Sequence, residues 1–262
     1  MPVRLAVMGS PRSGGTWLRL LLEGVYAIPG QPVPDPAALD WQSLPSECVL
    51  HLHWHRTPAL VQTLDDEGFR IVSIVRHPLD VLISILQFCL HDDTPLRWLG
   101  GENGDERSIR GVLPNSPAFV RYASGPRAAA LMAVNREWWP APGALQVRYE
   151  ELVADTPKEL CRVEAMLGHS ARQTAAAVAA SATIPKLRER TGVSHHFWQG
   201  RPGLWRFMLT ASAADQIALA HGSYCAELGY TCEADPNLSA AKAEANWLAL
   251  VSPPSPFTPR IP

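Results

Sequence analysis

A short apolar run, a glycine-rich loop and an amphipathic pattern follow one another at the start of the chain. Residues 4–8 (Arg-Leu-Ala-Val-Met) have the composition of a buried strand. Residues 9–16 read Gly-Ser-Pro-Arg-Ser-Gly-Gly-Thr, and residues 18–25 carry apolar side chains at the spacing of one helix face. The free N–H groups and the dipole at such a helix start attract anions. This order predicts a phosphate loop in an α/β fold; an ordinary strand-to-helix turn is the alternative.

The glycine loop lacks the lysine of nucleotide triphosphatases. Its frame is that of G-x-x-x-x-G-K-[ST], with Gly9, Gly14 and Thr16 in place, but Gly15 stands where the motif has lysine. That lysine binds the β- and γ-phosphates of a triphosphate. Arg12 is the only cation in the loop. The loop therefore predicts a phosphate ester that is not a triphosphate.

The composition excludes several classes of protein. The chain has 262 residues, 47% of them hydrophobic, which is enough for one full core. A formal net charge of −2 disfavours a general nucleic-acid binder, and no run approaches the ~18 apolar residues that cross a membrane. The first apolar run is too short for a targeting peptide. Five cysteines without a C-x-x-C pair favour free thiols in a reducing compartment. We expect a cytoplasmic protein.

Alternating strand and helix patterns predict a three-layer α/β fold of the P-loop type, with a central parallel sheet flanked by helices. Further strands are expected at 48–54, 69–75 and 144–148, and helices at 58–67, 79–90, 126–139, 157–167, 170–180 and 211–228. Residues 29–47 are expected to be irregular, and 91–118 to form a mobile lid or substrate loop. We expect one domain over 1–234, followed by a helix and a proline-rich arm over 235–262.

A second phosphate signal follows the strand predicted at 69–75. Arg76 comes at the carboxyl end of that strand, where ligands of open α/β sheets bind. Pro78 suits the first turn of the next helix, which places Ser84 about two turns into it. An arginine fork and a serine hydroxyl can clamp a phosphate. An arginine bound to a helix C-terminus or to Asp80 is the alternative.

Taken together, residues 11–17 and 76–84 resemble the two donor-binding motifs of the sulfotransferases that use 3′-phosphoadenosine 5′-phosphosulfate (PAPS). The family's motifs read P-[KR]-S-G-x-T-W, which binds the 5′-phosphosulfate, and R-x-P-x-D-x-x-x-S, which binds the 3′-phosphate. Residues 148–155 are similar to the family's Y-E-D-L segment, and 200–205 to its glycine/tryptophan loop. The resemblance implies transfer of a sulfuryl group from PAPS to the hydroxyl of a small-molecule acceptor, which releases 3′-phosphoadenosine 5′-phosphate (PAP).

The resemblance also implies roles for individual residues. Arg12 would stabilise the charge that develops on the leaving oxygen, while Arg76 and Ser84 would hold the 3′-phosphate. The family usually has an arginine and a lysine just before the glycine at position 200, and this chain does not, so we expect Arg201 to replace them. The other expected donor contacts are the amides of Ser13, Gly14, Gly15 and Thr16 at the 5′-phosphate, and Trp17, Tyr149, Thr183 and Ile184 at the adenine.

Three histidines alternate along the predicted strand at 48–54, so His51, His53 and His55 share one face. In the family a K-T-H segment carries the general base, and His53 aligns with its histidine. His51 stands where the family often has lysine. The alternatives are a metal site, because H-x-H on a strand often begins one, and, for His55, simple packing at a strand end. We expect His53 to be the base and no metal to be bound.

Two other functions stay open. A P-loop kinase for small molecules is disfavoured by the absent lysine and the absent acidic metal ligands. A non-catalytic nucleotide-binding protein would bind the donor without transfer. Aromatic residues at 54, 98, 119, 122, 138 and 139 suggest either an apolar acceptor or an ordinary core. Residues 206–215 share part of a dimer motif of the cytosolic enzymes, K-x-x-x-T-V-x-x-x-E, which leaves a homodimer open.

Overall fold

The structure, a computed structural model, describes residues 2–91, 98–191 and 196–251. Its centre is a five-stranded, all-parallel sheet in the order β2-β3-β1-β4-β5. The predicted α/β class with a central parallel sheet is confirmed. The strands are β1 (Arg4–Met8), β2 (Gly30–Val33), β3 (Cys48–Leu52), β4 (Arg70–Val75) and β5 (Leu145–Arg148).

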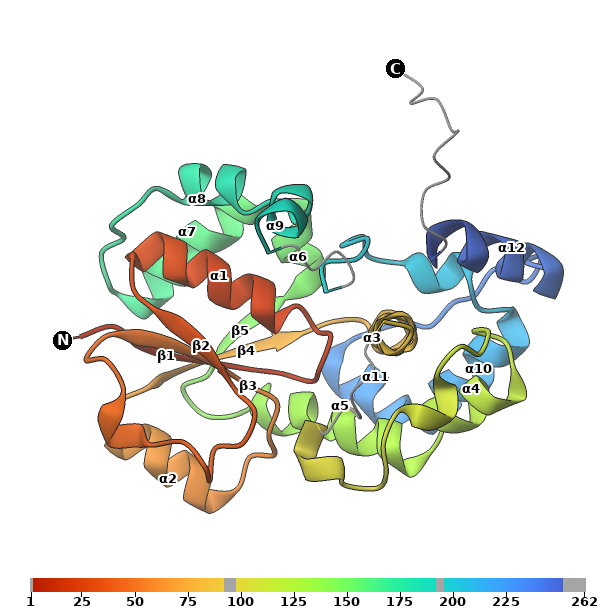
Figure 1. Ribbon diagram of the computed structural model, residues 1–262, viewed down its shortest axis with the longest axis horizontal. Coiled ribbons are helices and arrows are strands. Elements are labelled where there is room, and N and C mark those ends of the chain that lie inside the picture. The colour runs from red at the N-terminus through yellow and green to blue at the C-terminus, as the bar shows by residue number, and fades with distance from the viewer. Residues whose placement is uncertain (1, 92–97, 192–195, 252–262) are drawn as a thin grey trace.

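Helices cover both faces of this sheet (Figure 1). Alternate residues of β1 point to opposite faces, as the pleat requires. Leu5 and Val7 belong to the core shared with α1 (Gly15–Tyr26), α7 (Thr156–Leu167) and α8 (Ala175–Ser181). Ala6 and Met8 belong to the core shared with α2 (Pro58–Asp66) and α5 (Pro126–Trp138). All four side chains are fully buried, which explains why β1 reads as a continuous apolar run.

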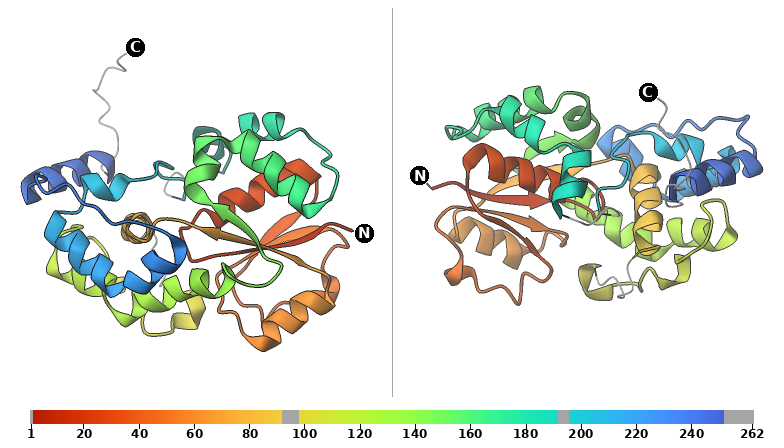
Figure 2. Two further views of the ribbon diagram at one scale, coloured as in Figure 1. Left: turned by 180° about the vertical axis from the view of Figure 1, so that it is seen from behind. Right: turned by 45° about the horizontal axis from the view of Figure 1, so that its top comes forward.

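Further helices gather beyond the carboxyl ends of the strands (Figure 2). They are α3 (Pro78–Cys89), α4 (Pro117–Ala123), α10 (Ala211–Ala220), α11 (Gly222–Leu228) and α12 (Ala240–Val251). Buried Asp80, in the first turn of α3, accepts hydrogen bonds from the N–H groups of Gly203 (2.6 Å) and Trp205 (3.1 Å). These bonds tie the loop before η4 (Leu204–Phe207) to α3, next to the end of β4.

The segment expected to be a lid is partly a packed wall. Within residues 98–116, two short turns, η2 (Trp98–Gly101) and η3 (Arg107–Ile109), bury Leu99 and Ile109. Buried Arg127 donates to the carbonyl oxygens of Trp98 (3.0 Å) and Glu102 (2.8 Å). Burial and these bonds anchor this part of the segment to the protein, and its expected role as a mobile lid or substrate loop stays a prediction. Residues 92–97 of the expected lid lie outside the described residues.

Other boundaries also differ from expectation. The segment 29–47, expected to be irregular, contains the edge strand β2 and the turn η1 (Trp41–Ser43). The helix expected over 211–228 is two helices, because it breaks at His221, whose Nε2 lies 2.6 Å from the Ala123 carbonyl oxygen. Patterning did not predict three short helices, namely α4, α6 (Tyr149–Ala154) and α9 (Ile184–Thr191).

The expected tail helix is present as α12, and it packs on the core through Ala243 and Trp247. The division of the chain at residue 234 stays a prediction, and the proline-rich arm, 252–262, lies outside the described residues. None of the described helices is both long and apolar enough to cross a membrane.

Candidate active site

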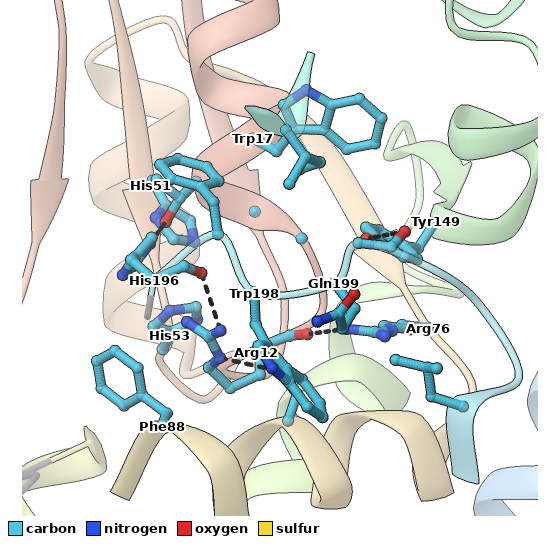
Figure 3. Close-up of a pocket in the computed structure, with 18 of the residues that line it drawn as sticks. Arg12, Trp17, His51, His53, Arg76, Phe88, Tyr149, His196, Trp198 and Gln199 are labelled. Carbon is cyan, nitrogen blue, oxygen red and sulfur yellow. Dashed lines mark hydrogen bonds between the residues drawn. The ribbon is translucent and has the colours of Figure 1, made fainter. Parts of the chain in front are cut away.

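A cavity of about 200 Å³ lies where the two predicted phosphate motifs meet (Figure 3). The motifs follow β1 and β4, which pair in parallel, so their loops emerge at the same edge of the sheet. Arg12 and Arg76, 64 residues apart in sequence, thereby come into contact. The predicted site residues that line the cavity are Arg12, Gly14, Gly15, Thr16, Trp17, His53, Arg76, Ser84, Tyr149 and Ile184.

Helix α1 begins without a side-chain cap. Its N-cap residue, Gly14, adopts a left-handed conformation (φ 99°), and no side chain of the described residues caps the helix by a hydrogen bond. Those groups have no partner within the helix, so Gly14, Gly15 and Thr16 can offer theirs to an anion. Ser13 differs from the prediction, because its N–H donates to the Ser10 carbonyl (3.2 Å) and its side chain is fully buried. The loop thus presents three of the four predicted amides.

Two arginines lie side by side at the cavity. Arg76 donates from Nη1 to the Arg12 carbonyl (3.3 Å), and Arg12 donates from Nε to Ser84 Oγ (3.1 Å). Within the described part of the chain, neither guanidinium forms an ion pair with a carboxylate. Burial and the charge of Arg76 lower the pKa of Arg12 to about 10, so Arg12 remains cationic at pH 7. Because positive charge without a counter-charge is costly in a buried site, the pair favours an anionic ligand.

Aromatic rings also line the cavity, next to Arg76. The Arg76 guanidinium lies 4.4 Å from the centroid of the Tyr149 ring, and Trp17 packs edge-on against that ring at 6.0 Å. With Ile184 these rings provide the flat apolar surface that a purine base needs. Thr183, also predicted here, is exposed and does not line the cavity.

His53 lies at the inner end of the cavity with its tautomer fixed. Its Nδ1 is 2.6 Å from the Gly9 carbonyl oxygen, which can only accept, so Nδ1 carries the proton and Nε2 keeps its lone pair. Burial, assisted by the charge of Arg12, lowers the pKa of His53 to about 4, although the bond to Gly9 opposes this. His53 is therefore a neutral imidazole at pH 7 with a proton-accepting nitrogen.

The neighbouring histidines have different surroundings. His51 is buried 4.4 Å from His53, measured between ring centroids, and burial holds the pKa of His51 well below its ordinary value. His55 lies between Glu137 (2.9 Å) and Glu102 (3.2 Å), which matches simple packing at a strand end. Among residues 2–91, 98–191 and 196–251, no three His, Cys, Asp or Glu side chains are arranged to hold a metal ion.

Comparison with known proteins identifies the fold. The chain is similar to mouse sulfotransferase SULT7A1, crystallised with PAP, with a TM-score of 0.65 and 16% identity over 85% of this chain and 84% of that one. It is also similar to retinol dehydratase, crystallised with androsterone and the inactive cofactor PAP, with a TM-score of 0.53 and 16% identity over 86% and 82%. The chain has the sulfotransferase fold. No family model matches it, and no curated protein matches it in sequence.

On this sulfotransferase fold, Arg201 is a third predicted contact that does not line the cavity, after Ser13 and Thr183. Arg201 is exposed, and its guanidinium lies 5.3 Å from the centroid of the Phe207 ring. Gly200 before it has a left-handed conformation (φ 66°), as does Gly203 after it (φ 77°). Gly200 lines the cavity, whereas Arg201, which lies between the two left-handed glycines, does not. The prediction that Arg201 replaces the family's basic pair is therefore not supported.

Sequence reasoning missed several cavity residues of this sulfotransferase fold. His196 lies with Nε2 3.1 Å from Thr16 Oγ1, and its carbonyl accepts from Arg12 Nη2 (2.9 Å). The Arg12 guanidinium also lies 4.6 Å from the centroid of the Phe88 ring. Phe88 follows Ser84 by one helical turn, so helix periodicity could have identified it. No comparable signal pointed to His196, because its position depends on a loop.

The absent lysine has a structural reason. A Cβ atom at position 15 would overlap Nε2 of His51, so a side chain there would require buried His51 to shift. We expect Gly15→Ala to lower the free energy of unfolding by about 1–3 kcal/mol through overpacking. The double variant Gly15→Ala/His51→Ala should lose clearly less than the sum of the single variants, because the overlap is gone.

Denaturant unfolding of the single and double variants measures this coupling. Gly222→Ala is the matched control, since Gly222 also begins a helix but has open space around it, and it should change the free energy of unfolding by less than about 0.5 kcal/mol. Additive effects at positions 15 and 51 would contradict the steric explanation.

Proposed function

We propose that the protein is a PAPS-dependent sulfotransferase that transfers a sulfuryl group to the hydroxyl of an apolar small molecule. The observation that carries the proposal is the meeting, in one cavity, of both arginine-bearing motifs and a neutral histidine with a free lone pair. The fold supports it, because the similar crystal structures are of sulfotransferase SULT7A1 and retinol dehydratase, each with PAP.

The cavity residues fit a nucleotide with two separate phosphates. The uncapped start of α1 suits one phosphate and Arg76 the other, since Arg76 Nε is buried without a hydrogen-bond partner in the described part of the chain. Trp17 and Tyr149 suit the adenine. PAPS supplies an activated sulfuryl group, bonded through oxygen to its 5′-phosphate. Ser84 lies against Arg12 rather than Arg76, so we assign it to orienting Arg12 as well as to the 3′-phosphate.

In the proposed reaction the acceptor oxygen bonds to sulfur, the bond from sulfur to the bridging oxygen breaks, and the acceptor proton passes to a base. The products are a sulfate ester and PAP. His53 Nε2 accepts the proton, because the Gly9 carbonyl holds the other nitrogen in its protonated form. Arg12 stabilises the negative charge that the leaving oxygen gains, which lowers the transition state more than the ground state.

A second, apolar cavity supports an apolar acceptor. It has a volume of about 180 Å³, shares His53 and Trp98 with the first cavity, and is otherwise lined by Val33, Pro34 and Leu99. Of these five residues only His53 is titratable, so a charged acceptor would find no partner among them. Retinol dehydratase was crystallised with retinol and with androsterone, both hydrophobic alcohols. Of the aromatic residues considered from sequence, 119, 122 and 138 lie in the core.

The first test separates donor binding from turnover. We expect PAP to bind more than tenfold better than AMP or ATP, because each charge-assisted phosphate contact contributes about 1.5–3 kcal/mol.

Arg76→Ala should weaken PAP binding, whereas Arg12→Ala should lower kcat more than it weakens binding. Calorimetry and steady-state kinetics measure the two effects. Equal affinity for AMP and PAP would refute the second phosphate site, and magnesium-dependent ATP turnover would favour the kinase alternative.

The second test addresses the base. His53→Ala should lower sulfuryl transfer by about 10²–10⁴-fold and leave PAP affinity unchanged. His55→Ala is the matched control, two residues further along the segment that follows β3, and it should retain most activity because His55 contacts carboxylates outside the cavity.

The pH profile gives an independent check on His53. Protonation inactivates the base, so a lowered pKa keeps the free enzyme active to lower pH, and the acidic limb of kcat/KM should fall well below pH 6.5, toward about pH 4. An acidic limb near 6.5, or a loss of transfer confined to His51 or His55 variants, would move the base to another residue.

A further inference from the structure

A buried chain of hydrogen bonds runs behind the cavity, through side chains that do not line it. The Asn135 side chain, on α5, accepts from the Ser10 N–H (2.6 Å) and donates from Nδ2 to Ser13 Oγ (3.2 Å). Nδ2 also donates to Tyr224 Oη on α11 (2.8 Å), and Tyr224 donates to the Arg76 carbonyl (3.0 Å). All these polar side chains are at most 1% exposed except that of Arg76, at 7%.

The protons of the Asn135 amide and the Tyr224 hydroxyl have a single consistent place. The Ser10 N–H can only donate, so the Asn135 oxygen must face it and the Asn135 amino group must face Ser13 and Tyr224. Tyr224 Oη accepts from Asn135 and therefore directs its own proton to the Arg76 carbonyl. Reversing any one bond would leave a buried polar group unpaired, which is costly. The chain therefore holds its end groups in one geometry.

Those end groups belong to the two phosphate-binding motifs. Ser10 and Ser13 are in the loop before α1, and Arg76 directly follows β4 and lines the cavity. We propose that Asn135 and Tyr224 are positioning residues that set the spacing between the two anion sites, and so the preference for a nucleotide with two separate phosphates. The proposal rests on the proposed function, because it assumes that both sites bind phosphate.

The two residues act on different ends. Removing the Tyr224 hydroxyl breaks the bond to the Arg76 carbonyl but leaves Asn135 bonded to both serines, so only the second anion site loses its support. Removing the Asn135 side chain also breaks the bonds to Ser10 and Ser13, so the loop before α1 loses its support too. A residue that merely stabilised the core would lower the affinity for every nucleotide by the same factor, or for none.

The experiment is calorimetry with two probes, PAP and adenosine 5′-phosphate, on the full chain. For Tyr224→Phe we expect PAP affinity to fall about two- to tenfold, the effect of one hydrogen bond, with adenosine 5′-phosphate affinity changed by less than twofold. Asn135→Ala should weaken both. Tyr26→Phe is the matched control, since Tyr26 is fully buried and its hydroxyl has no hydrogen-bond partner among the residues that the structure describes, and it should leave the ratio of the two affinities unchanged.

Circular dichroism establishes that each variant is folded. We expect Tyr224→Phe to fold, because the substitution removes only the hydroxyl oxygen. An unchanged ratio of affinities in Tyr224→Phe, with or without a loss of stability, would overturn the positioning role while leaving the proposed function standing. Wild-type protein that binds PAP no better than adenosine 5′-phosphate would instead refute the second phosphate site, and with it the premise of the proposal.

Discussion

The site depends on two guanidinium groups that the sheet forces together without a counter-charge. The parallel pairing of β1 with β4 puts Arg12 and Arg76 at one sheet edge, and no carboxylate of the described residues forms an ion pair with either. Burial makes that arrangement unfavourable for Arg12, whose pKa falls to about 10. A ligand with more than one negative group offsets this unfavourable free energy. Without an anion, the two arginines therefore lower the stability of the folded protein.

Two glycines next to the arginines allow neighbouring side chains to approach the loop closely. Gly14 admits the Tyr149 ring, with which any side chain at position 14 would collide. Gly15 likewise admits His51 into the space from which a lysine would extend in a triphosphate-binding loop. Where a triphosphate-binding loop has a lysine, the neutral imidazole of His51 occupies the space, beside His53. That difference is consistent with a donor whose reactive group is not a third phosphate.

Sequence patterns predicted the strand–loop–helix units of the site, because these units depend on residues close together in the chain. Strand, loop and helix patterns predicted the loops that carry Arg12 and Arg76, and these loops meet because the carboxyl ends of parallel strands share one edge. The roles of the two arginines stay predictions. Arg201 lies outside the cavity lining, and the course of the chain around it depends on the left-handed glycines at 200 and 203. Nothing in the sequence marked Asn135 or Tyr224, since their hydrogen bonds join segments far apart in the chain. Tertiary contacts alone give such residues their role.

A crystal structure of the protein with PAP tests the central claim most directly. The account predicts the 5′-phosphate within hydrogen-bond distance of the amides of Gly14, Gly15 and Thr16, and the 3′-phosphate within hydrogen-bond distance of the Arg76 guanidinium. The adenine should lie against Trp17 or Tyr149. A complex in which the 3′-phosphate points to solvent, or in which PAP binds outside the cavity, would contradict the account.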